Sequence, residues 1–180
     1  MVPFLIDMKM LLSNNGFLYV HSIISLFCLP IYSGKTAQYI LDTYNNEIIA
    51  SAVTNRMGSS LPYYECLKIL IEKAKEQPCP ATHHTDQGSV YSSADFYQTH
   101  KDYTKIMHSM SRVGTPTDNP IIESLNGWIK EEMKIDFDLQ DAENVPLFIE
   151  DYAYYFNNER LSYKLNYQNP VQYRTDQGFG

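Results

Sequence analysis

The sequence predicts an α/β domain in which a mixed sheet is flanked by helices. Two observations predict this fold class. The early part of the chain holds stretches rich in Leu, Ile, Val, Tyr and Phe, a composition typical of strands, over residues 4–12, 17–27 and 36–53. Later segments place apolar residues three and four positions apart, as helices do. With 180 residues, of which 44% are hydrophobic, the chain can bury one core as a single unit.

Helical spacing is first clear from Leu61 to Lys75, and Pro78 and Pro80 end it. A short strand is expected to end at Asp86, because Gly88 and the following serines break regular structure. The remaining elements expected are helices over Ser93–Tyr103, the region of Glu123 and Val145–Asn157.

The helix of Glu123 has a recognisable start. Asp118 or Asn119 is expected to cap it, and Pro120 is tolerated in a first turn. One stripe of this helix is polar and carries Asn119, Glu123, Asn126 and Lys130. The opposite stripe is apolar and carries Ile122, Leu125, Ile129 and Met133.

Asp86 and Glu123 are candidate site residues because both lie beside turn formers and hydroxyl side chains, outside any run of charges. Two such carboxylates repel each other if they lie together, unless a cation holds both. Oxygen ligands suit Mg²⁺ or Mn²⁺, and two such ions can clamp a phosphodiester displacement. On the residues alone, a turn Asp and an exposed helical Glu remain an open alternative.

Two sequence blocks carry a resemblance to a known family. The first follows the pattern H-S-D-Q-G-x-x-Y-x-S, and the matching residues are His84, Asp86, Gln87, Gly88, Tyr91 and Ser93. The second follows S-M-S-R-x-G-x-x-x-D-N-x-x-x-E-S-x-x-G-x-x-K-x-E, matched by Ser109, Met110, Ser111, Arg112, Gly114, Asp118, Asn119, Glu123, Gly127, Lys130 and Glu132. These blocks resemble the catalytic core of bacterial insertion-sequence transposases, in the retroviral integrase superfamily. The family leaves about 35 residues between its second and third acidic residues. Here 36 residues lie between Asp86 and Glu123.

The resemblance implies a ribonuclease H-like fold and a polynucleotidyl transferase that cleaves and joins DNA. It makes Asp86 and Glu123 the second and third acids of a D-D-E site with two Mg²⁺ or Mn²⁺ ions. The expected partners are transposon ends, target DNA and further copies of the chain on DNA, with Arg112, Asn119 and Lys130 as DNA contacts. The alternative is an inactive transposase remnant that at most binds DNA or intact transposase.

The first acid of the family precedes a block that Ile40-Leu41-Asp42-Thr43-Tyr44 resembles. Counting back 18 to 20 residues from Asp42 reaches Ser22, Ile23 and Ile24, which are not acidic. The nearest upstream candidate for this first acid is Asp7, which would then complete the catalytic and metal-binding set with Asp86 and Glu123. Two explanations stay open: an insertion within residues 24–38 displaces Asp7 along the sequence, or the first strand has lost its acid.

The end of the chain extends the resemblance through Tyr152, Phe156, Asn157, Arg160, Leu165, Asn169, Pro170 and Tyr173. We therefore expect one integrase-like core over residues 1–180, with a disruption within 1–38 as the open alternative. Residues 145–180 are expected to form its C-terminal helix and tail.

Charge and cysteine content restrict the remaining possibilities. The net charge of −7 argues against strong DNA binding without local basic patches. Three widely spaced cysteines suit buried thiols in a reduced, cytoplasmic protein, and no Cys/His spacing suits zinc. Residues 10–34 lack charged side chains, yet their turn formers favour a buried hairpin over a membrane span. Residues 109–118 are expected to form a mobile loop, and at most one of His83 and His84 to reach Asp86.

Overall fold

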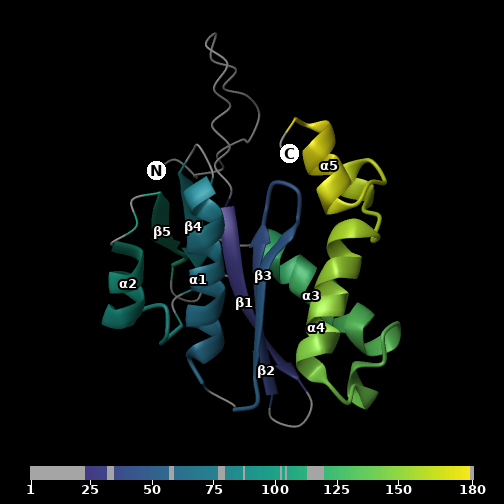
Figure 1. Ribbon diagram of the computed structural model, residues 1–180, viewed down its shortest axis with the longest axis horizontal. Coiled ribbons are helices and arrows are strands. Elements are labelled where there is room, and N and C mark those ends of the chain that lie inside the picture. Colours follow the sequence, from purple (N-terminus) through teal and green to yellow (C-terminus); the bar gives the residue numbers. More distant parts are fainter. Residues whose placement is uncertain are drawn as a thin grey trace.

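The computed structural model describes residues 23–178 except 32–34, 57–58, 77–79, 87, 102, 104 and 113–119, and for residues 23–31, 35, 100 and 120–123 it describes the backbone alone. Its main elements are shown in Figure 1. In chain order they are β1 (Ile23–Ile31), β2 (Lys35–Asp42), β3 (Ile48–Thr54), α1 (Leu61–Glu76), β4 (Ala81–Thr85), α2 (Ala94–Lys101), β5 (Ile106–Met110), α3 (Pro120–Ile135), α4 (Val145–Asn158) and α5 (Pro170–Asp176).

The five strands form one sheet in the order β3-β2-β1-β4-β5. The first three strands are antiparallel neighbours, whereas β1, β4 and β5 run parallel. The sheet is therefore mixed, as predicted. Strand β1 lies at its centre and joins the antiparallel half to the parallel half.

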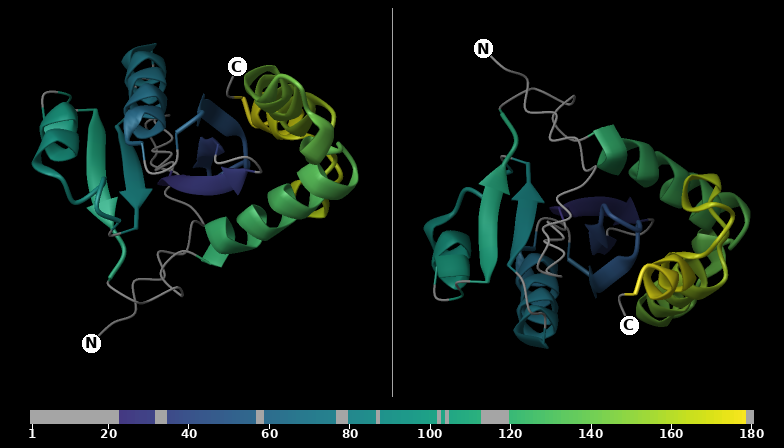
Figure 2. Two further views of the ribbon diagram at one scale, coloured as in Figure 1. Left: turned by 90° about the horizontal axis from the view of Figure 1, so that it is seen from below. Right: turned by 90° about the horizontal axis from the view of Figure 1, so that it is seen from above.

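Helices cover both faces of this sheet, as the end-on views in Figure 2 show. Alternate residues of β2 face opposite ways, because side chains alternate along a strand. Tyr39 and Leu41 join a core with α3 and α4, whereas Ile40 joins a second core with α1 and α2. The sheet thus separates two hydrophobic cores, and α3 belongs to the face opposite α1.

The stretch predicted as strand over residues 36–53 contains two strands and a tight turn. The Asp42 carboxylate accepts a hydrogen bond of 2.8 Å from the backbone N–H of Tyr44. Asn46 follows with a φ of 61°, a left-handed conformation that Asn tolerates. Strand β1 begins inside the predicted stretch 17–27 and continues to Ile31. Residues 4–12 lie outside the described part of the chain.

Two elements were not predicted from the sequence. Strand β5 (Ile106–Met110) occupies part of the segment predicted as a mobile loop from Ser109, so that prediction is wrong at its start. All five β5 residues pair with β4. Helix α5 begins after Asn169, whose side chain accepts a hydrogen bond of 2.7 Å from the N–H of Gln172.

A partly buried carboxylate joins α3 to α4. Glu132 accepts two hydrogen bonds from Nε of Arg160, at 2.8 and 3.1 Å. The hydroxyls of Tyr152 and Tyr155 also donate to it, at 2.9 and 3.5 Å. Burial, followed by the Glu132 charge, raises the pKa of Tyr152, so this hydroxyl keeps its proton at neutral pH. The guanidinium also lies 5.0 Å from the ring centre of Phe156.

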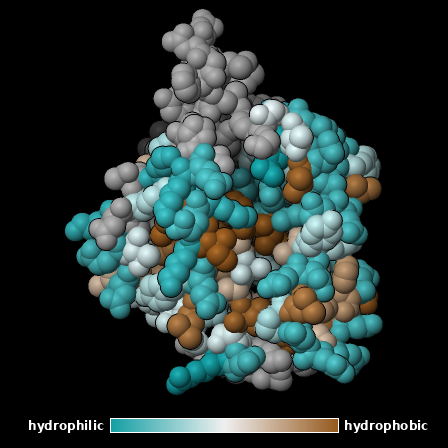
Figure 3. Space-filling view, in the orientation of Figure 1, coloured by the Kyte–Doolittle hydropathy of each residue, from teal (hydrophilic) through white to brown (hydrophobic). Residues whose placement is uncertain are grey.

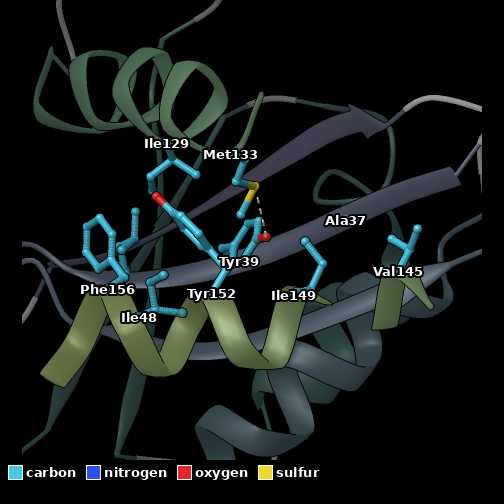
Figure 4. Close-up of a cluster of buried hydrophobic side chains, with 10 residues drawn as sticks. Ala37, Tyr39, Ile48, Ile129, Met133, Val145, Ile149, Tyr152 and Phe156 are labelled. Atoms are coloured by element: carbon cyan, nitrogen blue, oxygen red, sulfur yellow. Dashed lines mark hydrogen bonds between the residues drawn. The ribbon is translucent and has the colours of Figure 1, made fainter. Parts of the chain in front are cut away.

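Beside this network lies the core between the sheet and α4. Figure 4 shows Tyr39 of β2 and Tyr152 of α4 pointing toward Ile129 and Met133 of α3. The buried Tyr39 hydroxyl donates to Sδ of Met133 at 3.8 Å. The apolar stripe predicted for α3 is thus confirmed at Ile129 and Met133, which are fully buried.

The C-terminal segment is fastened to the β2–β3 hairpin. The Asn157 side chain accepts from the N–H of Ile48 at 2.8 Å and donates to its carbonyl at 2.9 Å. Further along, Arg174 forms an ion pair of 3.0 Å with Glu47. Asn157, which is among the matched residues of the tail, and Arg174, which is not, therefore connect α4 and α5 to this hairpin.

Among the described residues, Cys66 is a buried free thiol, as predicted, and burial raises its pKa. Its Sγ donates to the carbonyl of Gln38 at 3.5 Å. In that same part of the chain, no helix has the length and apolar character needed to cross a membrane.

Replacing Glu132 by Ala is expected to lower the free energy of unfolding by about 3 kcal/mol, because Arg160 would be left without its carboxylate in a partly buried site. Urea denaturation measures this change. The matched control is Glu131→Ala at the exposed neighbouring position, for which the change should stay within about 0.5 kcal/mol. Equal effects of the two substitutions would contradict a stabilising role of the network.

Candidate functional site

Asp86 lies directly after β4 and is exposed. Its Oδ1 accepts a hydrogen bond of 2.7 Å from the backbone N–H of Gly88. A Cβ atom at Gly88 would lie 2.9 Å from that oxygen and 3.3 Å from the Tyr91 ring. Glycine is therefore required here by close approach, and the Asp-x-Gly part of the first block forms a turn that orients the Asp86 carboxylate.

Strand β5 supports the end of β4 just before Asp86. The backbone N–H and the hydroxyl of Ser111 donate to the Thr85 carbonyl, at 2.9 and 3.2 Å. One residue earlier, His84 Nδ1 lies 3.1 Å from the hydroxyl oxygen of Ser109. Sequence reasoning missed this supporting role. The alternation of the serines in Ser109-Met110-Ser111 was the available signal, because alternation is typical of a strand.

The two histidines before Asp86 face opposite sides of the sheet. His83 is fully buried, and its ring centre lies 6.1 Å from that of Phe96 in α2. His84 points to the other face, which is the face that α3 and α4 cover. The two histidines thus face opposite ways, as expected for neighbours on a strand. That at most one of them reaches Asp86 stays a prediction.

The remaining residues of the first block have structural contacts. The buried Tyr91 hydroxyl accepts a hydrogen bond of 3.2 Å from Nε2 of Gln38. The Ser93 hydroxyl accepts from the N–H of Phe96 at 3.2 Å and so caps the start of α2. Around Asp86, this block therefore consists largely of residues that build the turn and the following helix.

Helix α3 begins at Pro120, as predicted, and Glu123 lies in its first turns. The helix contacts β1, the strand next to β4, and Figure 2 shows them side by side. The side chain of Glu123 and all of Asn119 lie outside the described part of the structure. Lys130, two turns further along, is exposed, as is Arg112 after β5.

Asn126 has an unusual environment. It lies one helical turn after Glu123, and its amide oxygen Oδ1 is buried without a hydrogen-bond partner. Ile129, the next residue on this side of α3, is fully buried in the core. Asn126, a member of the predicted polar stripe, is thus partly buried, whereas Lys130 of the same stripe is exposed.

The position of the first acid can be compared with β1. The register of β1 and β2 pairs Ile24 with Asp42, and residues 24–31 and 35–42 pair continuously. Strand β1 contains no Asp or Glu between Ile23 and Ile31. A third carboxylate beside Asp86 must therefore come from outside this strand. Asp7 lies outside the described residues, and its role stays a prediction.

We tested whether the residues present suit a divalent cation. In the described part of the chain, no three Asp, Glu, His or Cys side chains group together as metal ligands. Carboxylates such as those of Asp86 and Glu123 are nevertheless the oxygen donors that Mg²⁺ prefers. Asp86 is exposed, so a hydrated ion can reach its carboxylate. These donors suit a hydrated Mg²⁺ ion that keeps several of its waters.

A separate hollow lies away from these residues. A groove of about 450 Å³ runs over β3 between α1 and α4, and Val53, Ile69 and Ile149 contribute its apolar walls. Figure 3 shows this hydrophobic surface. None of the predicted site residues lines the groove.

The sequence and fold of this chain can be compared with those of known protein families. Two family models described as "Integrase core domain" match residues 28–116 and 104–170, which together include nearly all of the sheet and helices α1 to α4. The chain belongs to the integrase core family. The resemblance seen in the two sequence blocks is thereby confirmed.

Relatives of this integrase core are bacterial. A transposase-like protein of Haemophilus influenzae is 32% identical over 138 residues, which are 76% of this chain and 61% of that protein. The transposase of insertion sequence element IS904 from Lactococcus lactis is 30% identical over 135 residues, 74% of this chain and 52% of the relative. The chain thus spans about half the length of the curated relatives it matches.

Solved structures confirm the ribonuclease H-like fold of this integrase core. The catalytic core domain of BIV integrase matches with a TM-score of 0.65 at 11% identity, over 88% of this chain and 96% of that one. The catalytic core domain of HTLV-2 integrase, solved in complex with magnesium, matches with a TM-score of 0.61 at 16% identity, over 86% of this chain and 97% of that one.

Substituting Gly88 by Ala is expected to push the Asp86 carboxylate aside and to lower the free energy of unfolding by about 1–3 kcal/mol, because the new Cβ would meet Oδ1 and the Tyr91 ring. Thermal unfolding and the NMR position of the residue-88 amide report both effects. Gly127→Ala in α3 is the control, since a Cβ there meets nothing within 4 Å. That variant should be slightly more stable, by up to about 1 kcal/mol. A stable Gly88→Ala with an unchanged turn would refute the close-approach argument.

Proposed function

We propose that this integrase core performs metal-dependent phosphodiester cleavage and strand transfer in DNA transposition. One observation carries the proposal. Asp86, in the block that resembles the family's second acid, is exposed directly after β4, and β4 pairs with β1, the strand that α3 contacts. Glu123 lies on that same helix. The similarity to the IS904 transposase of Lactococcus lactis supports this function.

In the proposed site, Asp86, Glu123 and Asp7 hold two Mg²⁺ or Mn²⁺ ions. When bound, such ions stabilise the charge on the attacking and leaving oxygens of a phosphodiester displacement. Oδ1 of Asp86 accepts from the Gly88 N–H, which orients this exposed carboxylate. Glu123 is carried by a helix whose C-terminal half is anchored in the core through Ile129 and Met133.

DNA is the proposed partner, with transposon ends and target DNA as substrates and several copies of the chain assembling on them. Arg112 comes before α3 in the sequence, Lys130 lies within this helix, and both side chains are exposed. Asn119 directly precedes the helix in the sequence. We propose that they contact phosphates and nucleotide edges. Because the whole chain has a net charge of −7, binding should depend on these local cations rather than on overall attraction of the chain to DNA.

A second candidate is a core without catalytic activity that still binds DNA or intact transposase. The specific observation in its favour is the sequence of β1, which has apolar residues and no acid next to β4. The two candidate functions are distinguished by whether a third carboxylate completes the site. The active form requires Asp7 or another carboxylate in that place.

Nicking of supercoiled plasmid DNA in the presence of Mn²⁺ or Mg²⁺ tests the proposal. Asp86→Asn and Glu123→Gln should each lower the rate at least about 100-fold, because each removes a charged metal ligand. The control is Asp95→Asn, which removes an exposed carboxylate from α2. If the wild-type chain shows no more metal-dependent nicking than the Asp86→Asn and Glu123→Gln variants, the catalytic proposal is rejected and the binding function remains.

The role of Asp7 can be tested separately. If Asp7 completes the site, Asp7→Asn should reduce nicking as strongly as Asp86→Asn does. A fully active Asp7→Asn chain would show that the third acid lies elsewhere. The folded state of each variant is checked by its thermal unfolding temperature.

A further inference from the structure

The main chain of β3 is capped at its start and open further along. In the described sheet β3 is a terminal strand, so one of its edges has no neighbouring strand. Asn157 occupies the N–H and the carbonyl of Ile48, and Nζ of Lys73 donates to the carbonyl of Ile49 at 2.7 Å. Among the described residues, no side chain bonds to the main chain of residues 50–54. This second half of β3 can therefore still accept a strand.

The groove over β3 lies along this open half. Ser51, Ala52 and Val53 line it from β3, and Figure 1 shows this strand between α1 and α4, which form the walls. The three strand residues are only half-buried, and two of them have small side chains, so a second main chain can approach the edge. Ile69 of α1 and Ile149 of α4 make the walls partly apolar. An open strand edge between apolar walls is what an extended peptide requires.

The charged residues of the groove are mostly acidic. Glu150 lines it from α4, and Glu65 and Lys68 line it from α1. All three are exposed, and none of them forms an ion pair within the described part of the chain. Two carboxylates and one ammonium group, on a chain with a net charge of −7, favour a basic occupant. A second copy of the chain, bound symmetrically, would instead bring the same carboxylates together.

We propose that this groove binds an extended, basic segment of another protein, which joins the sheet as a further strand beside residues 50–54. Main-chain hydrogen bonds supply affinity in this mode, and the side chains of the added strand alternate between the two walls. Apolar side chains of the segment pack on one wall, and Lys or Arg side chains reach a carboxylate on the other. This site is independent of the proposed catalytic function, because no predicted site residue lines the groove.

A synthetic heptapeptide in which valine and lysine alternate tests the proposal. Fluorescence anisotropy of the labelled peptide should show saturable binding to the full chain, and the NMR amide shifts should change most at residues 50–54. Methylation of the main-chain nitrogens of the peptide removes the donors that strand pairing uses, and should weaken binding at least about 10-fold. A peptide with glutamate in place of lysine should not bind, because its charges repel those of the walls.

Two substitutions in the groove test its role. Glu150→Lys should weaken binding about fivefold or more, because it replaces an attraction at the α4 wall by a repulsion. The matched control is Glu143→Lys, which makes the same change of charge at an exposed residue that does not line the groove. Its affinity should stay within about twofold of wild type. Ser51→Arg places a long side chain in the groove and should abolish binding at an unchanged unfolding temperature. If this variant does not fold, the two glutamate variants decide.

Several outcomes would overturn the proposal. Absence of peptide binding to the wild-type chain would reject it outright, and equal affinity for the methylated peptide would show that no strand is added. Equal losses in Glu150→Lys and Glu143→Lys would indicate a general attraction between charges. A dimer in sedimentation velocity that Ser51→Arg abolishes and the peptide does not dissociate would show that a second copy fills the groove. None of these results affects the nicking test of the catalytic function.

Discussion

The carboxylate of Glu132 is the contact on which the arrangement of the helices depends. A carboxylate that is only 15% exposed requires partners, and here Tyr152 in the middle of α4 and Arg160 just after the end of α4 supply them. Because the two partners lie at different points along this segment, Glu132 constrains both the distance and the rotation between α3 and α4. The packing of Ile129 and Met133 alone would define them less strictly, because apolar contacts have no direction.

Much of the fold could be predicted because hydrophobic periodicity and helix stops are local. Helix α1 ends where the prolines after Lys75 require, and α3 starts at Pro120. Strand β5 escaped prediction because its five residues include His108 and Ser109, and its conformation comes from pairing with β4 rather than from its own composition. Helix α5 has only seven residues, so its cap at Asn169 is its main sequence signal.

The candidate site likewise has a part that local sequence determines and a part that depends on the order of the strands. Gly88 and Ser93 make local contacts, and the sequence blocks placed them correctly beside Asp86. The contact between Ser111 and the Thr85 carbonyl spans 26 residues and could not be predicted without the order of the strands. Similarly, counting back along the sequence from Asp42 located β1. The pairing of β1 with β2 then showed that Ile24 lies opposite Asp42. Sequence spacing therefore identified positions well, whereas which side chains meet required the fold.

The bond pair between Asn157 and Ile48 has a consequence for the outer edge of the sheet. In the described sheet β3 is a terminal strand, and such strands can recruit a strand from another molecule. The Asn157 amide occupies both the N–H and the carbonyl of Ile48, as a neighbouring strand would. A strand from another molecule cannot pair with Ile48, the first residue of β3, without displacing Asn157 and with it α4. One amide side chain thereby protects the chain against edge-to-edge aggregation.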